Sequence, residues 1–375
     1  ANYQRAAIRF QNNFRITKKL LLTTGVTFSE TNTKSGGSGY GTVSSNIGLY
    51  PYAELVDESG NALPIAKQYR LPFIDTLGKG KLLDWKYYPI TNSDHETQEV
   101  KTQNTLLNIG LDYTIVKGLN INLLYQLERE DQNSSFLFDN NSYYARDIIN
   151  TFTQINNTTG VTTYKVPVGG IIDVSNESLT GKNFRAGISY SKTWLKSDLS
   201  IIAGNEIRER VFTTGGFRTY GFIDNPLSSG IVDNVNQYPS FITGSSMSIP
   251  SYSGSAFSQS LTRFVSIYSN AAYNLLKKYT LSVSTRRDAS NQFGVSTNNK
   301  WTPLWSAGLG YQLSNEKFYR FRLIPVLKFR ATIGFSGNVN PSRFGSTTTA
   351  SSGYSPYTQA TVYTFLSFYN PDLRW

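Results

Sequence analysis

The sequence predicts an all-β fold, a transmembrane antiparallel β-barrel with long extracellular loops. In four places the chain alternates apolar and polar residues, turns back through a short segment that contains lysine, and then alternates again. A period of two puts alternate side chains on opposite faces of a sheet. Long polar segments separate the four units. Short turns at one end and long loops at the other are typical of an outer-membrane barrel and differ from a soluble sandwich.

The clearest of these units is a hairpin at about 105–130. Leu107 and Ile109 lie on its apolar face, Asn108 and Asp112 lie on the other face, and the turn contains Lys117. Three further hairpins and two single strands bring the expected total to about ten strands. The hairpins are expected at 4–30, 182–211 and 260–289, with turns at Lys18-Lys19, Lys196 and Lys277-Lys278, and the strands at 302–314 and 327–337.

The polar segments between the hairpins are expected to be loops outside the cell, and the lysine turns are expected on the periplasmic side. The long loops are 31–103, 131–180 and 212–258. A further polar segment, 338–375, contains a possible loop strand at 361–369, and a short helix is expected before Pro325.

The alternation also predicts which side chains face lipid and which face the lumen, because arginine on the lipid face costs about 2–4 kcal/mol near the midplane. The residues expected to face lipid are Leu107, Ile109, Leu111, Ile121, Leu123, Ile188, Ile201, Val283, Leu327, Phe329 and Ile333. Those expected to face the lumen are Asn108, Asp112, Arg185, Glu206, Arg286 and Arg330.

Composition narrows the possible functions. No segment reaches the roughly 18–20 continuous apolar residues of a spanning helix, so a membrane crossing would use strands. The net charge is +11, but lysines gather in turns and arginines on polar strand faces, which accounts for the charge without nucleic acid. Cysteine is absent, and His95 and Met247 are each single, which argues against a metal site. The sequence therefore predicts neither an enzyme nor a cofactor.

Aromatic residues of the loops are the candidate ligand-binding residues. They could stack on sugar rings or contact the apolar groups of a peptide, and ordinary packing within the loops is the alternative interpretation. The candidates are Trp85, Tyr87, Tyr88, Tyr143 and Tyr144.

The last third of the chain contains four motif-like segments, RRDASNQFG at 286–294, NKWTPLWSAGLGY at 299–311, LKFRATIGFSGN at 327–338 and NPDLRW at 370–375. In these segments the chain resembles the SusC-like TonB-dependent transporters. Ala289 stands where the family usually has glycine, and the stretch 302–305 is shorter than the common pattern. The order and spacing of the motifs still favour the assignment.

This resemblance implies that residues 1–375 are an internal part of the barrel domain, because barrels of this family have about 22 strands. The plug, the amino-terminal domain and the carboxy-terminal strands would then lie outside this sequence. The implied function is energy-coupled import of oligosaccharides or peptides across the outer membrane. The implied partners are TonB, a SusD-like surface lipoprotein and outer-membrane lipid. The alternatives are a passive porin and a β-rich surface adhesin or carbohydrate-binding protein.

Overall fold

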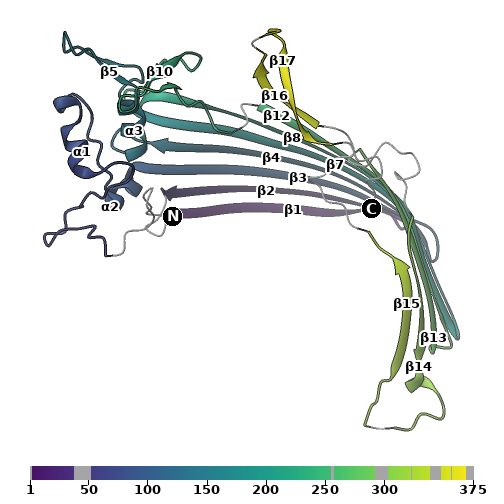
Figure 1. The fold of residues 1–375 in the computed structure, drawn as a ribbon. Helices are drawn as coiled ribbons and strands as arrows, with labels where there is room; N and C mark the ends of the chain where they lie inside the picture. The colour runs from purple at the N-terminus through teal and green to yellow at the C-terminus, as the bar shows by residue number, and fades with distance from the viewer. Residues whose placement is uncertain are drawn as a thin grey trace.

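The computed structural model describes residues 2–37, 52–254, 257–291, 303–321, 323–337, 348–355 and 357–368. Its main feature is one curved antiparallel sheet in which ten long strands follow one another in the order β1-β2-β3-β4-β7-β8-β12-β13-β14-β15 (Figure 1). The expected all-β barrel fold and the expected ten strands are therefore confirmed. Within the described residues, β1 and β15 are the two edges of the sheet and do not pair with each other.

The ten long strands of this sheet range from 8 to 27 residues. They are β1 (Asn2–Thr17), β2 (Leu20–Gly36), β3 (Glu96–Val116), β4 (Leu119–Phe138), β7 (Gly170–Trp194), β8 (Ser197–Ile223), β12 (Phe257–Leu275), β13 (Tyr279–Ser290), β14 (Pro303–Gln312) and β15 (Lys328–Phe335). β9 (Ser228–Gly230) pairs with β8 beside the main path.

Shorter elements lie in the connections. Three two-stranded hairpins are formed by β5 (Thr153–Ile155) with β6 (Thr162–Tyr164), β10 (Gln237–Pro239) with β11 (Ser246–Ser248), and β16 (Thr348–Tyr354) with β17 (Thr361–Ser367). The helices are α1 (Leu71–Thr76), η2 (Leu77–Gly80), α2 (Pro89–Asn92), η3 (Ser93–His95), α3 (Tyr143–Thr151) and η4 (Leu313–Asn315). No helix among the described residues is long and apolar enough to cross a membrane.

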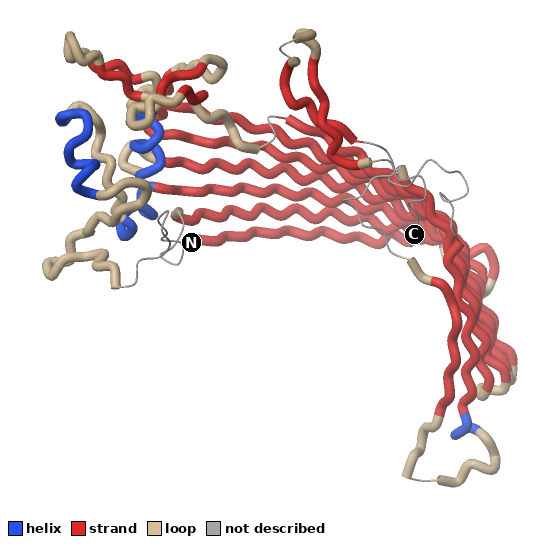
Figure 2. The backbone as a smooth tube through the Cα atoms, viewed as in Figure 1, coloured by secondary structure: helices blue, strands red, loops and turns tan. Residues whose placement is uncertain are grey.

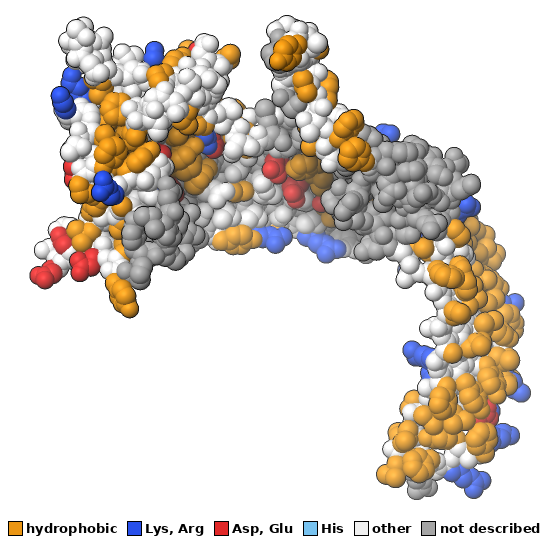
Figure 3. Space-filling model, viewed as in Figure 1, with side chains coloured by type: hydrophobic (Ala, Val, Ile, Leu, Met, Phe, Trp, Pro, Cys, Tyr) orange, Lys and Arg blue, Asp and Glu red, His pale blue; other side chains and the backbone are white. Residues whose placement is uncertain are grey.

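The strand register confirms the predicted division of side chains between two faces. Residues that pair directly across neighbouring strands share a face, and Leu111 pairs with Leu123, while Ile121 pairs with Ile188. Following the pairs through the sheet puts the predicted apolar residues from Leu107 to Ile333 on the outer face; Leu327 precedes β15. All six predicted lumen residues lie on the opposite face. In Figure 3, orange apolar side chains gather along the right-hand convex edge of the sheet, around β13 and β14.

The predicted loop boundaries were wrong, because the strands continue far into the expected loops 31–103, 131–180 and 212–258. β8 ends at Ile223 and β7 begins at Gly170. A bilayer needs only about 9–11 residues of each strand. Beyond the apolar band no lipid requires apolar residues at alternate positions, so the two-residue pattern disappears from the sequence while the backbone pairing persists.

Two local expectations had different outcomes. The prediction of a short helix before Pro325 is wrong for the residues described there. A 3₁₀ turn, η4, occurs earlier in the chain instead. The possible loop strand near 361–369 corresponds to β17. Parts of the family-like motifs, 292–302, 338 and 370–375, lie outside the described residues.

The short lysine turns and the long connections lie at opposite ends of the strands. Figure 2 shows the helices α1 to α3 and the hairpin β5–β6 gathered at the same strand end. We call this part, made of residues 52–95, 139–169 and 224–254, the loop module. The sheet and the loop module each present polar groups that are candidates for ligand contact.

Candidate functional site

The inner face of the sheet carries a row of arginines held by buried carboxylates. Glu206 is 7% exposed and lies between two arginines. Its carboxylate accepts hydrogen bonds from Arg185 at 3.1 Å and from Arg208 at 2.8 Å. Register explains this contact, because Arg185 is the direct cross-strand partner of Glu206. The two guanidinium groups stay about half exposed, so they can offer further N–H donors to a polar solute.

A second ion pair extends this row. The Nε of Arg286 donates to both carboxylate oxygens of Asp288 at 2.9 Å, and its Nη2 donates to Ser266. Asp288 is only 2% exposed, whereas the side chain of Arg286 is 48% exposed. A small cavity of about 150 Å³ lies between these residues and Glu206. The carboxylates therefore orient arginines that themselves face the interior.

A glycine makes room for an aromatic ring on the same inner face. A Cβ on Gly204 would lie 2.7 Å from the carbonyl oxygen of Ala186 and 2.7 Å from the hydroxyl of Tyr268. Gly204 and Tyr268 are direct cross-strand partners of β8 and β12. The close approach requires glycine, and it lets the tyrosine lie flat along the wall beside the arginine row.

The loop module has a hydrophobic core of its own, organised around α3. The hydroxyl of Ser142 caps α3 by accepting a hydrogen bond from the amide of Ala145. Ala145 and Ile149 are fully buried on one face of the helix. Asn150 binds the backbone of Leu83 twice, through its Oδ1 and its Nδ2, each at 2.9 Å. These contacts fix segments that are far apart in the sequence.

The structure brings the five predicted ligand-binding aromatics to this module, mainly as packing residues. Trp85, Tyr87 and Tyr143 are 3%, 9% and 5% exposed and belong to one buried cluster. The rings of Tyr87 and Tyr143 meet edge to face at 5.2 Å. Tyr88 and Tyr144 are partly exposed. Ligand contact stays a prediction, and these last two tyrosines have the more accessible rings.

Two charged groups lie within the aromatic cluster. The carboxylate of Asp147 accepts a 2.7 Å hydrogen bond from the indole of Trp85, and burial raises the pKa of this carboxyl. The ammonium of Lys67 lies 4.1 Å from the ring centre of Tyr87, and burial lowers the pKa of Lys67. The same burial raises the pKa of Tyr143. These shifts share one cause, the loss of water around the charged form.

The module is joined to the sheet by an arginine. The guanidinium of Arg218 donates two hydrogen bonds of 2.6 Å to Asp173 and a third of 2.6 Å to the hydroxyl of Tyr144. The hydrogen bonds to Asp173 raise the pKa of Arg218, which keeps its charge fixed. Burial raises the pKa of the neighbouring Tyr220 to about 12. This contact holds α3 against the ends of β7 and β8.

A polar cleft of about 570 Å³ opens on the loop module. It lies between the η2 region, the β5–β6 hairpin and the segment after β10. Its polar and aromatic lining includes Lys79, Lys81, Gln154, Asn156, Asn157 and Phe241. Amide and ammonium groups beside an aromatic ring suit sugar hydroxyls or peptide carbonyl and carboxylate groups.

Sequence reasoning found the inner-face positions Arg185, Glu206 and Arg286 but missed the partners Arg208 and Asp288. The same two-residue alternation would have placed both on the inner face. The prediction also treated 131–180 as loop and so missed α3. Two features of the sequence could have predicted this helix: the capping Ser142 and the helical spacing of the apolar residues that follow it.

No family model matches the chain. Among curated proteins, TonB-dependent receptor P39 of Formosa agariphila is 31% identical over 111 residues, which cover 29% of this chain and 10% of that receptor. TonB-dependent receptor P3 of the same organism is 25% identical over 214 residues, covering 56% of this chain and 20% of the receptor. The matches therefore span a fifth or less of each curated relative.

Solved structures share the fold of this chain. The RagAB peptide importer in its closed-closed state matches all of this chain with a TM-score of 0.70 and 18% identity, and 37% of the importer chain is covered. Another structure, of the RagAB peptide transporter, gives a TM-score of 0.71 at the same coverage. The predicted resemblance is confirmed: the chain is similar in sequence to parts of two TonB-dependent receptors, and it shares its fold with 37% of the RagAB importer chain.

Proposed function

We propose that the chain forms part of the barrel wall of an energy-coupled importer for peptides or oligosaccharides. The observation that supports this most is the likeness of the whole chain to 37% of the RagAB peptide importer chain. Residues 1–375 would then be a partial barrel domain, with the plug, the amino-terminal domain and further strands elsewhere in the protein. The receptor would transport its cargo chemically unchanged and would not act as an enzyme.

In this proposal the loop module faces the outside of the cell and the lysine turns face the periplasm. The polar cleft beside Lys79 and Lys81 would make early contact with the solute. The arginine row around Glu206 would offer half-exposed donors along the inner wall. A solute rich in carbonyl, carboxylate or hydroxyl groups fits both surfaces, which favours peptides or oligosaccharides over apolar cargo.

The proposal includes two partners. TonB would supply energy through the part of the receptor that carries the plug. A SusD-like surface lipoprotein would cover the loop module from outside. The exposed apolar side chains of the third segment of the module offer a surface for such a partner: Leu227, Ile231 and Val235 are 77%, 97% and 89% exposed. Exposed apolar groups of this size commonly mark protein contacts.

Uptake by cells that carry the full-length receptor tests the transport function. Labelled peptide and oligosaccharide mixtures would be offered to cells with and without TonB. The proposal expects uptake that depends on both the receptor and TonB. Uptake that continues unchanged without TonB would favour a passive porin. Binding without any uptake would favour an adhesin or carbohydrate-binding protein.

The choice of peptide or oligosaccharide needs a separate readout. The purified full-length receptor, isolated from its native host with any bound lipoprotein, would be analysed for co-purified small molecules by mass spectrometry. A Lys79→Gln and Lys81→Gln variant should lower recovery of the bound solute. Lys117→Gln, in a turn at the opposite strand end, is the matched control. Equal recovery from both variants would remove the cleft from the proposed route.

A further inference from the structure

The outer face of the sheet continues beyond its apolar band as a polar surface. The outer limit of the apolar band is marked, strand by strand, by Ile8, Phe28, Leu107, Leu127, Phe184 and Ile207, and farther out single apolar residues such as Val211 and Leu261 occur among polar ones. Beyond that line the outward positions of β4, β7 and β12 hold Arg129, Lys182 and Arg263. Cations directly beside an apolar band are placed where lipid headgroups begin.

Two rows of polar residues cross the strands above this line. The first row consists of direct cross-strand partners on five adjacent strands: Gln4, Asn32, Lys101, Asn133 and Asn176. Four amides therefore flank one ammonium group. Strands lie about 4.8 Å apart, so the row extends for about 19 Å.

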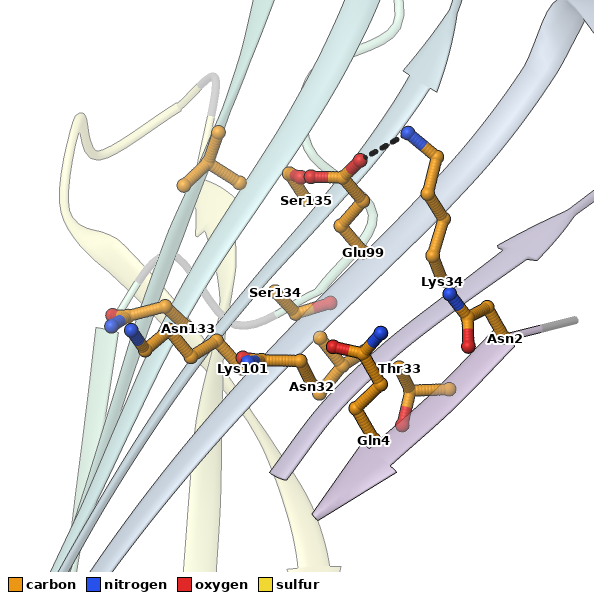
Figure 4. A pocket seen from close by; sticks show the side chains of 12 residues that line it. Asn2, Gln4, Asn32, Thr33, Lys34, Glu99, Lys101, Asn133, Ser134 and Ser135 are labelled. Atoms are coloured by element: carbon orange, nitrogen blue, oxygen red, sulfur yellow. Dashed lines mark hydrogen bonds and ion pairs between the residues drawn. The ribbon is translucent and has the colours of Figure 1, made fainter. Parts of the chain in front are cut away.

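The second row lies one outward position farther from the band. It holds Asn2, Lys34, Glu99 and Ser135, again as direct partners on adjacent strands. The two rows, apart from Asn176, line a groove of about 460 Å³ (Figure 4). Figure 4 shows the Lys34 ammonium reaching the Glu99 carboxylate along one side of the groove, with Asn32, Lys101 and Asn133 lying together on the other.

The lysines of the groove are held in place but keep donors available. Lys34 binds Glu99 at 2.6 Å, and Lys101 binds Glu30 at 3.1 Å. An ammonium group has three N–H donors, so a single carboxylate contact leaves others for a ligand. The amides both donate and accept. The groove therefore suits a ligand that combines sugar hydroxyls with phosphate, bound more by hydrogen bonds than by net charge.

The height of the groove above the apolar band agrees with binding of such a headgroup. Gln4 is four residues beyond Ile8 on β1, which is about 14 Å along a strand. With a strand tilt of about 40°, it lies about 10 Å above the edge of the apolar band. The groove thus opens sideways into the headgroup layer, toward neighbouring lipids and away from the barrel interior.

We propose that this groove binds the phosphorylated sugar headgroup of an outer-leaflet glycolipid. The acyl chains of the glycolipid would lie against the apolar band below, which a row that includes Glu30, Gln103 and Asp131 separates from the groove. The cations beside the apolar band, Arg129 and Lys182, would bind phosphates close to the acyl chains. The amide rows would bind the sugars above them. This inference requires the loop module to face outward, and it is independent of what the receptor transports.

Binding of lipopolysaccharide by the purified full-length receptor in detergent tests the inference. The double variant Lys34→Gln and Lys101→Gln removes both ammonium groups. A lysine near an anionic lipid surface contributes about 1 kcal/mol, so each substitution should weaken binding about fivefold and the pair about 25-fold. Lys117→Gln, on an exposed turn at the other end of the strands, is the matched control and should bind as the native receptor does.

A second variant tests the shape of the groove. Asn133→Trp would fill it without changing charge and should also weaken binding. Heat-dependent migration on gels would verify that each variant is folded. If folded double and Trp variants bind lipopolysaccharide as tightly as Lys117→Gln, the inference is wrong. Complete competition by millimolar inorganic phosphate would also overturn it, because the groove would then be a simple anion site.

Discussion

Arg218 and Asp173 face each other across β8 and β7 and are joined by two parallel hydrogen bonds of 2.6 Å. Their side chains are only 7% and 15% exposed. A third donor of the same guanidinium reaches Tyr144 on α3. One arginine therefore holds a helix of the loop module against the sheet, so the orientation of that module depends on a planar group with fixed donor geometry.

Replacing Arg218 by lysine should loosen the loop module. Lysine keeps the charge but cannot make two parallel bonds to Asp173 and also reach Tyr144. Removing one partner of a buried pair costs about 3–5 kcal/mol, so lysine, which keeps the charge but loses the parallel bonds, should cost less than this. The full-length receptor should therefore show faster proteolysis in 139–169, measured by limited digestion and mass spectrometry. Arg129→Lys is the control, because the exposed pair Arg129–Asp131 contributes at most about 1 kcal/mol. Equal digestion of both variants would argue against the role assigned to Arg218.

Variants of Trp85 and Tyr88 should distinguish loop aromatics that pack the core of the module from those that contact a ligand. Trp85 is 3% exposed in the core of the module, so Trp85→Ala should cost about 3–5 kcal/mol of stability. Tyr88 is only partly buried, so Tyr88→Ala should leave the fold nearly intact. Hydrogen exchange of the module would measure the first effect, and solute binding by the folded Tyr88 variant would measure the second. Unchanged binding would remove Tyr88 from the candidate site.

The sequence predicted the sheet well because lipid imposes an alternating pattern. Within the apolar band most outward positions are apolar, with exceptions such as Asn12 and Asn205, so the face of a residue such as Ile109 follows from its place in the alternation. The same rule correctly placed Arg185 and Glu206 on the inner face. Their mutual contact was not predicted, because the alternation gives the face of a residue but not its cross-strand partner.

The loop module was not predicted, since no such rule acts outside the band. No lipid faces the sheet there, and the end of β8, which runs to Ile223, is partly covered by the module, so that Tyr220 is only 1% exposed. The core of the module is assembled from distant segments, for example when Asn150 binds the backbone of Leu83. Contacts of this kind depend on tertiary packing and leave little periodic signal in a single sequence.

Gly204→Ala should impair folding of the barrel wall. The new methyl group would lie 2.7 Å from a backbone oxygen of β7 as well as from Tyr268, and backbone cannot move aside without disturbing the ladder. Overpacking of this kind costs about 1–3 kcal/mol. Gly25→Ala is a matched control on the same inner face, because its nearest neighbour would be 3.7 Å away. The fraction of folded receptor after refolding, read from heat-dependent migration on gels, should fall only for Gly204→Ala.

The buried carboxyl of Asp147 should make the loop module less stable as pH rises from acidic values. Burial raises its pKa in the folded protein above the unfolded value of about 3.9, so the folded state disfavours ionisation. Its favourable contribution is complete below the unfolded pKa and is lost as pH rises through the folded pKa.

Asp147→Asn keeps an acceptor for the indole of Trp85 and removes the titration. We therefore expect the stability of Asp147→Asn relative to the native receptor to increase from about pH 4 upward and then level off. Hydrogen exchange of 143–151 in both proteins, corrected for intrinsic exchange rates at each pH, measures this difference. A difference that stays constant between pH 4 and 7 would show that ionisation of Asp147 does not influence the module.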